Sequence, residues 1–236
     1  MGCAKRLPLE NILNCRDLGG YPCENGFTEY GIFLRCGIPE TPTENDIVEV
    51  LKHGVTTVID LRDEDEAERI PSVFKFIDEV DYHNICLLEF NAAISEMYHQ
   101  SLEKSYEYSL ENYKDNYKKA LETIADAKEG CVLYHCFFGK DRTGMLTMLL
   151  LHIAGVCVED IIADFQTTYT YILPFIKKKK SDGVVWDENA ESFKSTPDSI
   201  AYVINYLNTK YGSIDGYLKD IGVTNETVIK IKNKFF

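Results

Sequence analysis

The sequence has little positive charge for its size: 25 Lys and Arg stand against 38 Asp and Glu in 236 residues, for a net charge of −13. A nucleic-acid-binding surface needs a basic footprint that neutralises phosphates. The acidic composition therefore argues against nucleic acid as a partner. It argues equally against an anionic ligand, unless a local site overrides the field of the whole chain.

Long apolar runs are also missing. The longest, Met145–Ala154, contains Thr147 and His152 and is far shorter than the ~20 residues that a membrane-spanning helix needs. We expect a buried helix there and no transmembrane segment. The N-terminus has no apolar core of the kind found in secretory signals, so we expect a cytoplasmic location and reduced thiols.

Cysteine occurs at eight positions, but no two of them form a Cys-x-x-Cys pair. Neither the cysteines nor the histidines have the spacing of metal ligands, so we expect no metal and no cofactor. The apolar content of 45% suffices for a packed core. Without repeats or low-complexity linkers, the chain is expected to form a single domain over residues 1–236. Nothing in the sequence indicates the oligomeric state.

Helical and buried-strand patterns alternate along the chain, which indicates an α/β protein. The run Val55–Leu61 is β-branched and almost wholly apolar, as in a strand buried on both faces. It follows a helix that Thr43 caps and Gly54 ends. Pro174 is expected to end a later helix. Further strands are predicted at 31–36, 81–88 and 131–134, and further helices at 143–154, 158–172, 197–207, 214–219 and 226–236, with one or two long amphipathic helices in 91–128.

The most informative segment is Cys131–Gly144, in which a strand ends at His135, a tight loop follows, and a helix begins near Thr143. A loop that opens a helix directs free backbone N–H groups at one point, and the helix end adds about half a positive charge. Such a loop is an anion site built mostly of backbone. It explains how a chain of net charge −13 can bind a phosphate.

Four residues around this loop point to phosphoryl transfer. Cys136 at a helix N-terminus beside a cation is expected to ionise readily and act as a nucleophile. Arg142 offers a planar fork for two phosphate oxygens. Gly139 permits a turn that a side chain would obstruct, and Thr143 can steady the sulfur as a leaving group. The combination predicts a phosphocysteine intermediate, whereas a lone buried cysteine is usually a core residue.

The run His135–Gly144, His-Cys-x-x-Gly-Lys-Asp-Arg-Thr-Gly, resembles the signature of the cysteine-dependent protein tyrosine phosphatase superfamily. Its Gly-Lys-Asp-Arg-Thr-Gly part is similar to that of bacterial tyrosine/serine phosphatases that also act on phosphoinositides. Other segments are similar to this branch as well: Asn14–Tyr21, Arg35–Gly37, Gly54–Arg62, Tyr211–Ser213 and Tyr217–Leu218. Phe138 departs from the pattern, because the family usually has a small residue there.

The resemblance implies a protein tyrosine phosphatase-like fold, with a central mixed, mostly parallel sheet flanked by helices. It implies hydrolysis of phosphomonoesters: phosphotyrosine, phosphoserine or phosphothreonine in a phosphorylated protein, or a phosphoinositide. In this family, helices inserted before the signature strand can cover the active site, so 91–128 is a candidate helical lid; plain packing is the alternative. A phosphate-binding module without turnover and a sulfurtransferase-like protein are the other functional interpretations.

The general acid has two candidates, since no Trp-Pro-Asp sequence is present and Trp186 is followed only by Asp187. Asp141, inside the loop, is the acid that the resemblance implies, with a helix cap as the alternative. Asp60 follows a buried strand and so lies at the edge of the sheet where ligands bind, with a structural bond to Arg62 or to loop amides as the alternative.

The predicted substrate-binding residues are those of the loop: Phe137, Phe138, Gly139, Lys140, Asp141 and Arg142. Lys140 is interpreted either as a contact to further phosphates, which the resemblance implies, or as a solvent-exposed lysine. Arg16 and Asp17 are expected to pair with each other. The run Lys177–Lys180 either attracts anionic lipid or a multiply phosphorylated substrate, or is a solvated helix end.

Overall fold

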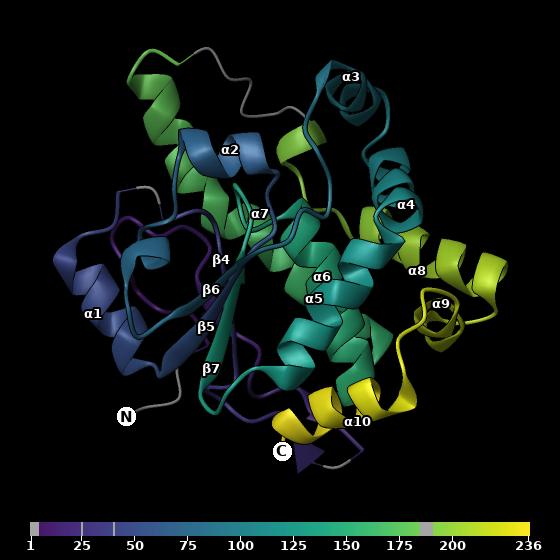
Figure 1. Ribbon diagram of the computed structural model, residues 1–236. Coiled ribbons are helices and arrows are strands. Elements are labelled where there is room, and N and C mark those ends of the chain that lie inside the picture. Colours follow the sequence, from purple (N-terminus) through teal and green to yellow (C-terminus); the bar gives the residue numbers. More distant parts are fainter. Residues whose placement is uncertain (1–4, 25, 40, 185–190) are drawn as a thin grey trace.

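The computed structural model describes residues 5–24, 26–39, 41–184 and 191–236. A five-stranded sheet forms its centre, in the order β1, β4, β7, β5, β6. The strands are β1 (Arg16–Asp17), β4 (Phe33–Cys36), β7 (Cys131–His135), β5 (Val55–Asp60) and β6 (Asp81–Asn84). Only β1 is antiparallel to its neighbour in this sheet; the other pairs are parallel. The predicted fold class is confirmed (Figure 1).

Helices cover both faces of the sheet (Figure 1), which is why β5 and β7 are nearly continuous apolar runs. On one face, α1 (Glu44–Lys52) places Val50 in a buried cluster that also contains Leu34, Val58 and Leu133. Thr43 caps this helix in a capping box, as predicted. On the other face lie α5 (Lys114–Asp126), α6 (Asp141–Ala154), α8 (Pro197–Tyr211), α9 (Ile214–Asp220) and α10 (Asn225–Lys234).

The segment 91–128 forms three helices, where one or two were predicted: α3 (Ala92–Gln100), α4 (Leu102–Asn112) and α5. Helix α5 buries Tyr117, Leu121 and Ile124 in the main core. Helix α3 lies at the periphery, near the end of the sheet where α2 (Glu64–Arg69) is found (Figure 1). The predicted amphipathic segment is therefore core at its C-terminal part and peripheral at its N-terminal part.

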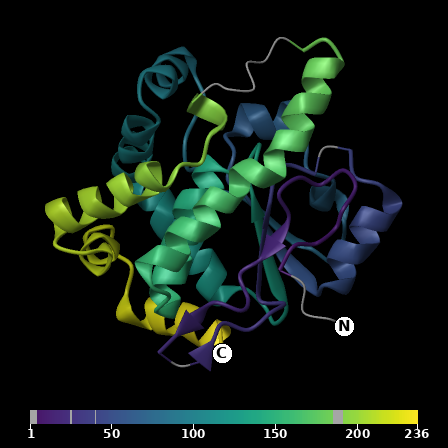
Figure 2. The ribbon, with the colours of Figure 1, turned by 180° about the vertical axis from the view of Figure 1, so that it is seen from behind.

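Helix α7 (Val158–Ser181) continues through Pro174, so the prediction that this proline ends the helix was wrong. Ile172 and Ile176 are fully buried on either side of the proline. Their packing holds the helix across a residue that lacks an N–H donor. Lys177–Lys180 consequently lie in its last turns, which extend past the neighbouring elements (Figure 2).

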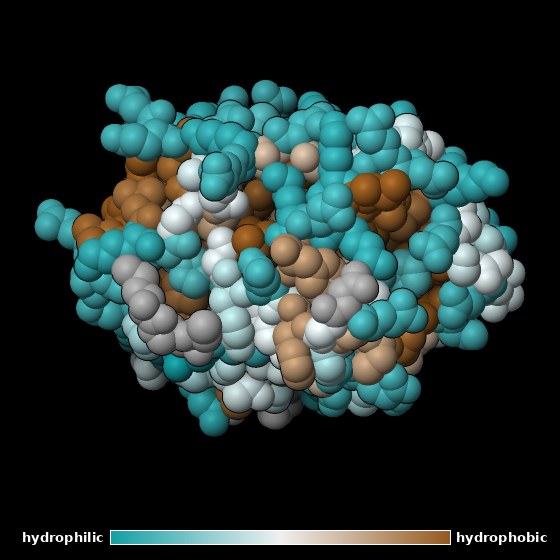
Figure 3. All heavy atoms as spheres, turned by 90° about the horizontal axis from the view of Figure 1, so that it is seen from below, coloured by the Kyte–Doolittle hydropathy of each residue, from teal (hydrophilic) through white to brown (hydrophobic). Residues whose placement is uncertain are grey.

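The remaining elements are short: a hairpin of β2 (Pro22–Cys23) and β3 (Gly26–Phe27), and the 3-10 helices η1 (Val73–Phe76) and η2 (Glu191–Phe193). On the face seen from below, hydrophobic side chains form separate patches among hydrophilic ones (Figure 3). Within the described ranges, no helix is both long enough and apolar enough to cross a membrane.

Candidate active site

The predicted strand–loop–helix is present. Strand β7 ends at His135, and α6 begins at Asp141 rather than near Thr143. Gly139 has a φ of +64°, and a Cβ at this position would lie 2.4 Å from the Cys36 backbone. The turn therefore requires glycine, both for its dihedral angle and for its close approach to β4.

The carbonyl groups of this loop are bonded from behind. The carbonyl of Phe137 accepts a hydrogen bond from the Ile38 N–H at 2.9 Å. The Asn14 Nδ2 donates to the carbonyls of Phe138 and Gly139 at 3.1 and 2.8 Å. In a trans peptide the C=O and N–H groups point in opposite directions. The N–H groups of residues 138–140 therefore face away from these partners, toward the site.

A buried ion network supports the loop further. Arg35 donates from Nη2 to the Gly139 carbonyl at 2.7 Å and pairs through Nη1 with Asp164 at 2.6 Å. Arg16 pairs with the other carboxylate oxygen of Asp164 at 2.9 Å. Burial alone would raise the pKa of Asp164, but Arg16 and Arg35 outweigh it and hold this pKa well below its usual range.

Arg16 thus pairs with Asp164 of α7, and the expected pair of Arg16 with Asp17 was wrong. Asp17 instead contacts His53 Nε2 at 2.6 Å and accepts from the N–H groups of Gly19 and Gly31. The cause is strand alternation: successive residues of β1 point to opposite faces of the sheet.

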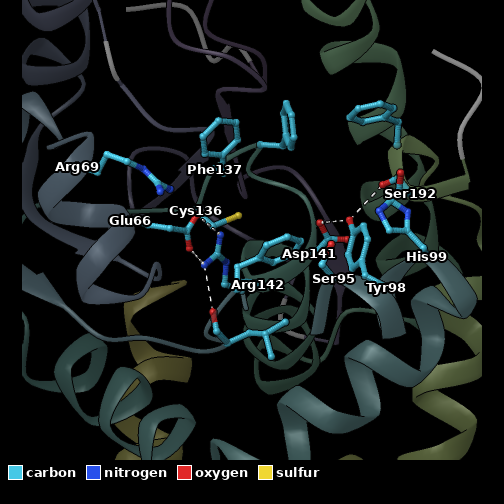
Figure 4. Close-up of a pocket in the computed structure, with 14 residues that line it drawn as sticks. Glu66, Arg69, Ser95, Tyr98, His99, Cys136, Phe137, Asp141, Arg142 and Ser192 are labelled. Atoms are coloured by element: carbon cyan, nitrogen blue, oxygen red, sulfur yellow. Dashed lines mark hydrogen bonds and ion pairs between the residues drawn. The ribbon is translucent and has the colours of Figure 1, made fainter. Parts of the chain in front are cut away.

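Five of the predicted site residues line one pocket of about 600 Å³ (Figure 4): Cys136, Phe137, Phe138, Asp141 and Arg142. Four others do not line it: Asp60, Gly139, Lys140 and Thr143. Cys136 is only 3% exposed, so a reactant must enter the pocket to reach its sulfur.

Arg142 is held by a carboxylate from α2. Its Nη1 donates to Glu66 Oε2 and to the Leu88 carbonyl, and its Nη2 donates to Glu66 Oε1 at 3.2 Å. A guanidinium has five N–H donors. These contacts leave Nε–H and the second Nη2–H, which lie on one edge of the fork. That edge remains for a bidentate anion.

Glu66 was not singled out in the sequence, where it lies in an acidic run after Arg62. One local signal was present: Asp63 caps α2 by accepting from the Glu66 N–H, which fixes where the helix begins. Local pattern does not reveal that Glu66 meets a side chain 76 positions away.

Asp141 receives hydrogen bonds from two tyrosines of 91–128. The Tyr98 hydroxyl lies 2.8 Å from Oδ2, and the Tyr106 hydroxyl lies 2.5 Å from Oδ1. Lys140 Nζ lies 2.5 Å from the same Oδ1. Asp141 occupies the first turn of α6, directly after the loop, and is one of the residues that line the pocket (Figure 4).

Lys140 is fully buried, so the interpretation as a solvent-exposed lysine was wrong. Besides Asp141, its ammonium contacts the Tyr106 hydroxyl at 3.4 Å and the Lys194 carbonyl at 3.3 Å. It also lies over the Tyr98 ring at 5.6 Å. These contacts direct Lys140 under α3 and α4; the predicted contact to further phosphates stays a prediction.

Asp60 lies behind the loop and is paired with Arg62, whose Nε and Nη2 donate to it at 2.8 and 2.5 Å. The Tyr82 hydroxyl donates at 2.8 Å, and His135 Nδ1 lies 3.7 Å away. Burial would raise the pKa of Asp60, but His135, Arg62 and Tyr82 together lower it to about 2. The same burial lowers the pKa of His135. This geometry matches the structural alternative for Asp60.

Thr143 is fully buried in the first turn of α6. Its Oγ1 has no hydrogen-bond partner within the described part of the chain. The predicted contact with the sulfur of Cys136 is therefore not formed here, but the hydroxyl remains available as a hydrogen-bond donor.

Aromatic rings form the wall beside the loop. Phe138 packs edge-on to Phe137, Phe193 and Phe175, with centroids 4.9, 5.7 and 6.3 Å apart. Phe90 and Tyr98 form a second edge-to-face pair at 5.8 Å. The departure at Phe138 thus links the phosphate loop to α7 and η2. The residues Trp186 and Asp187 lie outside the described ranges.

Known proteins resemble this chain along its length. It is 29% identical over 205 residues to a tyrosine-protein phosphatase of Nostoc commune, covering 81% of this chain and 69% of that protein. It is 32% identical over 124 residues to the triple specificity protein phosphatase PtpB of Mycobacterium tuberculosis, covering 43% of this chain and 42% of that protein.

Among solved structures, TpbA of P. aeruginosa aligns with a TM-score of 0.41 and 17% identity, over 80% of this chain and 86% of that one. The sequence model described as "Tyrosine phosphatase family" matches residues 7–236. That match spans the sheet, the loop around Cys136 and the helices on both faces. The chain is therefore a phosphatase and belongs to the tyrosine phosphatase family.

Proposed function

We propose that this phosphatase hydrolyses phosphomonoesters on Cys136, with phosphotyrosine in proteins as the principal substrate. The observation that carries the proposal is the loop itself: three consecutive N–H groups face the site because Ile38, Asn14 and Arg35 hold the preceding carbonyls from behind. A phosphate bound there would lie beside the sulfur and the open edge of Arg142. The run Gly139–Gly144 favours the bacterial branch of the family.

The reaction balances as two displacements. The sulfur of Cys136 forms a bond to phosphorus while the ester P–O bond breaks, and the leaving oxygen takes a proton from Asp141. Water then attacks the phosphocysteine, gives a proton back to Asp141, and releases inorganic phosphate with the thiolate. The Thr143 hydroxyl, for which the described residues offer no other partner, is available to donate to the sulfur as it leaves.

Asp141 is the better candidate for the acid because of where it lies. Asp141 lines the pocket, whereas Asp60 does not, and Asp60 is already saturated by Arg62 and Tyr82. A carboxyl whose pKa is about 2 carries no proton to donate near neutral pH.

The pocket wall favours an aryl phosphate. The rings of Phe137, Phe138 and Phe90 offer edges and faces against which a tyrosyl ring can pack. The M. tuberculosis relative is named a triple specificity phosphatase, which supports testing more than one substrate class. Phosphoserine, phosphothreonine and phosphoinositides are the further classes that the sequence resemblance implies.

The test is a panel of phosphotyrosine and phosphoserine peptides and inositol lipids, assayed for released phosphate. We expect turnover by the wild-type protein and none by Cys136→Ser, which should still bind a phosphotyrosine peptide. Cys157→Ser is the control, because Cys157 is exposed and is separated in sequence from Cys136. Substantial activity in Cys136→Ser would refute the proposal.

The acid is tested by leaving group. Asp141→Asn should slow phosphoserine or phosphoinositide hydrolysis by about 10²–10⁴-fold, the usual cost of losing a general acid. Nitrophenyl phosphate, whose leaving group needs no proton, should lose far less. An equal, small loss on both substrates would reduce Asp141 to a helix cap.

A further inference from the structure

The two oxygens of the Asp141 carboxylate have different surroundings. Oδ1 is approached by Lys140 Nζ and by the Tyr106 hydroxyl, both at 2.5 Å. Neither of these residues lines the pocket, so the hydrogen-bond donors to Oδ1 lie outside the pocket lining. Oδ2 is approached by the hydroxyl of Tyr98 at 2.8 Å, and Tyr98 does line the pocket (Figure 4).

This asymmetry decides which oxygen can carry a transferable proton. A carboxylate oxygen has about two acceptor positions, and on Oδ1 both are taken by donors. Lys140 is fully buried, and its ammonium group disfavours protonation of the oxygen that it contacts. A proton destined for a leaving group is therefore carried on Oδ2, next to Tyr98.

The Tyr98 hydroxyl has one proton and two acceptors within reach: Asp141 Oδ2 at 2.8 Å and the Ser192 carbonyl of η2 at 3.1 Å. Burial, with the neighbouring carboxylate, raises the pKa of Tyr98 well above its usual 10, so this proton stays on the phenol. By rotating, the hydroxyl can donate to Ser192 while Oδ2 is protonated, and to Oδ2 once the proton has left.

We propose that Tyr98 is a positioning residue for the acid: it orients Oδ2 of Asp141 toward the leaving group and stabilises the carboxylate that proton transfer leaves behind. The inference rests on the proposed role of Asp141. In the proton-transfer step the Oδ2–H bond breaks, the leaving oxygen gains that proton, and Tyr98 exchanges its acceptor without losing its own proton. Helix α3, which lines the pocket with Ser95, Tyr98 and His99, thereby contributes a positioning residue to the site.

The experiment compares Tyr98→Phe with the wild-type protein on phosphoserine peptide and on nitrophenyl phosphate. We expect kcat for phosphoserine to fall roughly 10- to 100-fold, the range for one hydrogen bond to a charged group, with KM nearly unchanged. The loss on nitrophenyl phosphate should be small. In an Asp141→Asn background, Tyr98→Phe should cause no further loss on phosphoserine.

Tyr206→Phe is the matched control, because its hydroxyl also donates to a carboxylate, that of Glu111, at 2.7 Å, but does not line the pocket. Thermal unfolding of all variants checks that each is folded. An equal loss of Tyr98→Phe on both substrates, or a full additional loss in the Asp141→Asn background, would overturn the inference. If Asp141→Asn itself shows no dependence on the leaving group, the proposed acid fails first, and the two failures are distinguishable.

Discussion

Replacing Asp60 by Asn should destabilise the fold without affecting proton donation to the leaving group. Asp60 is fully buried and ionised, and it is the counter-charge of Arg62, which is fully buried as well. An amide keeps the shape of the side chain but turns an NH₂ toward a guanidinium that has only donors. The variant therefore leaves a buried cation without its partner.

The magnitude follows from the ionisation of Asp60. Its pKa falls from an ordinary 3.8 to about 2 in the folded chain, which corresponds to roughly 2 kcal/mol of stability at neutral pH. Breaking a buried pair by removing one partner costs about 3–5 kcal/mol. We therefore expect a loss of roughly 2–5 kcal/mol, or a Tm lower by roughly 5–15 °C for a chain of this size.

The pH dependence has a definite sign. Because the pKa of Asp60 is lower in the folded chain, Asp60 contributes to the unfolding free energy at pH values above about 3.8. This contribution is lost as the pH falls toward about 2. The difference in unfolding free energy between wild type and variant should thus be largest near neutral pH and shrink below pH 4. Urea unfolding at several pH values measures it, with Asp215→Asn, in an exposed pair with His152, as the control of little effect.

Activity completes this test. Asp60→Asn should leave the ratio of phosphoserine to nitrophenyl phosphate turnover unchanged at a temperature where it is folded. A variant of wild-type stability that selectively loses phosphoserine turnover would refute the reasoning and return Asp60 to the role of general acid.

Three other outcomes are expected. Glu66→Ala should lower kcat roughly tenfold, because the Arg142 guanidinium loses the carboxylate that holds it in place. Glu66→Gln should lower kcat less because the amide keeps an acceptor, and wild-type kcat in both variants contradicts this. Arg69 lines the pocket and makes no ion pair within the described ranges, so it is free to contact a second phosphate. Arg69→Ala should therefore lower kcat/KM about tenfold more for a phosphoinositide bisphosphate than for phosphotyrosine, and equal losses argue against a second anion contact. EDTA should leave turnover unchanged while vanadate blocks it, because loop N–H groups and Arg142 supply the positive charge; recovery only with added zinc or magnesium contradicts this.

The sequence alone determined the features that depend on neighbouring residues. Cys136, Gly139 and Arg142 lie within seven consecutive residues, from the end of β7 to the first turn of α6, so the chemistry proposed for them was predicted from local spacing. The buried run Val55–Leu61 identified a strand covered on both faces, and Thr43 identified a helix start. Pro174 shows where local reasoning fails, because packing of Ile172 and Ile176 outweighs the intrinsic preference of one residue.

Only the tertiary structure decided which distant groups meet at the loop. Glu66 reaches Arg142 across 76 positions, and Tyr98 reaches Asp141 across 43. Two acidic residues were candidate acids in the sequence: Asp141, which the resemblance implies, and Asp60 as the second candidate. They differ because parallel strand pairing places Asp60 beside His135 behind the loop, while the start of α6 places Asp141 in the pocket. The sequence specifies the chemistry of each side chain, but contacts between residues that are remote in sequence form only when the sheet and its helices pack together.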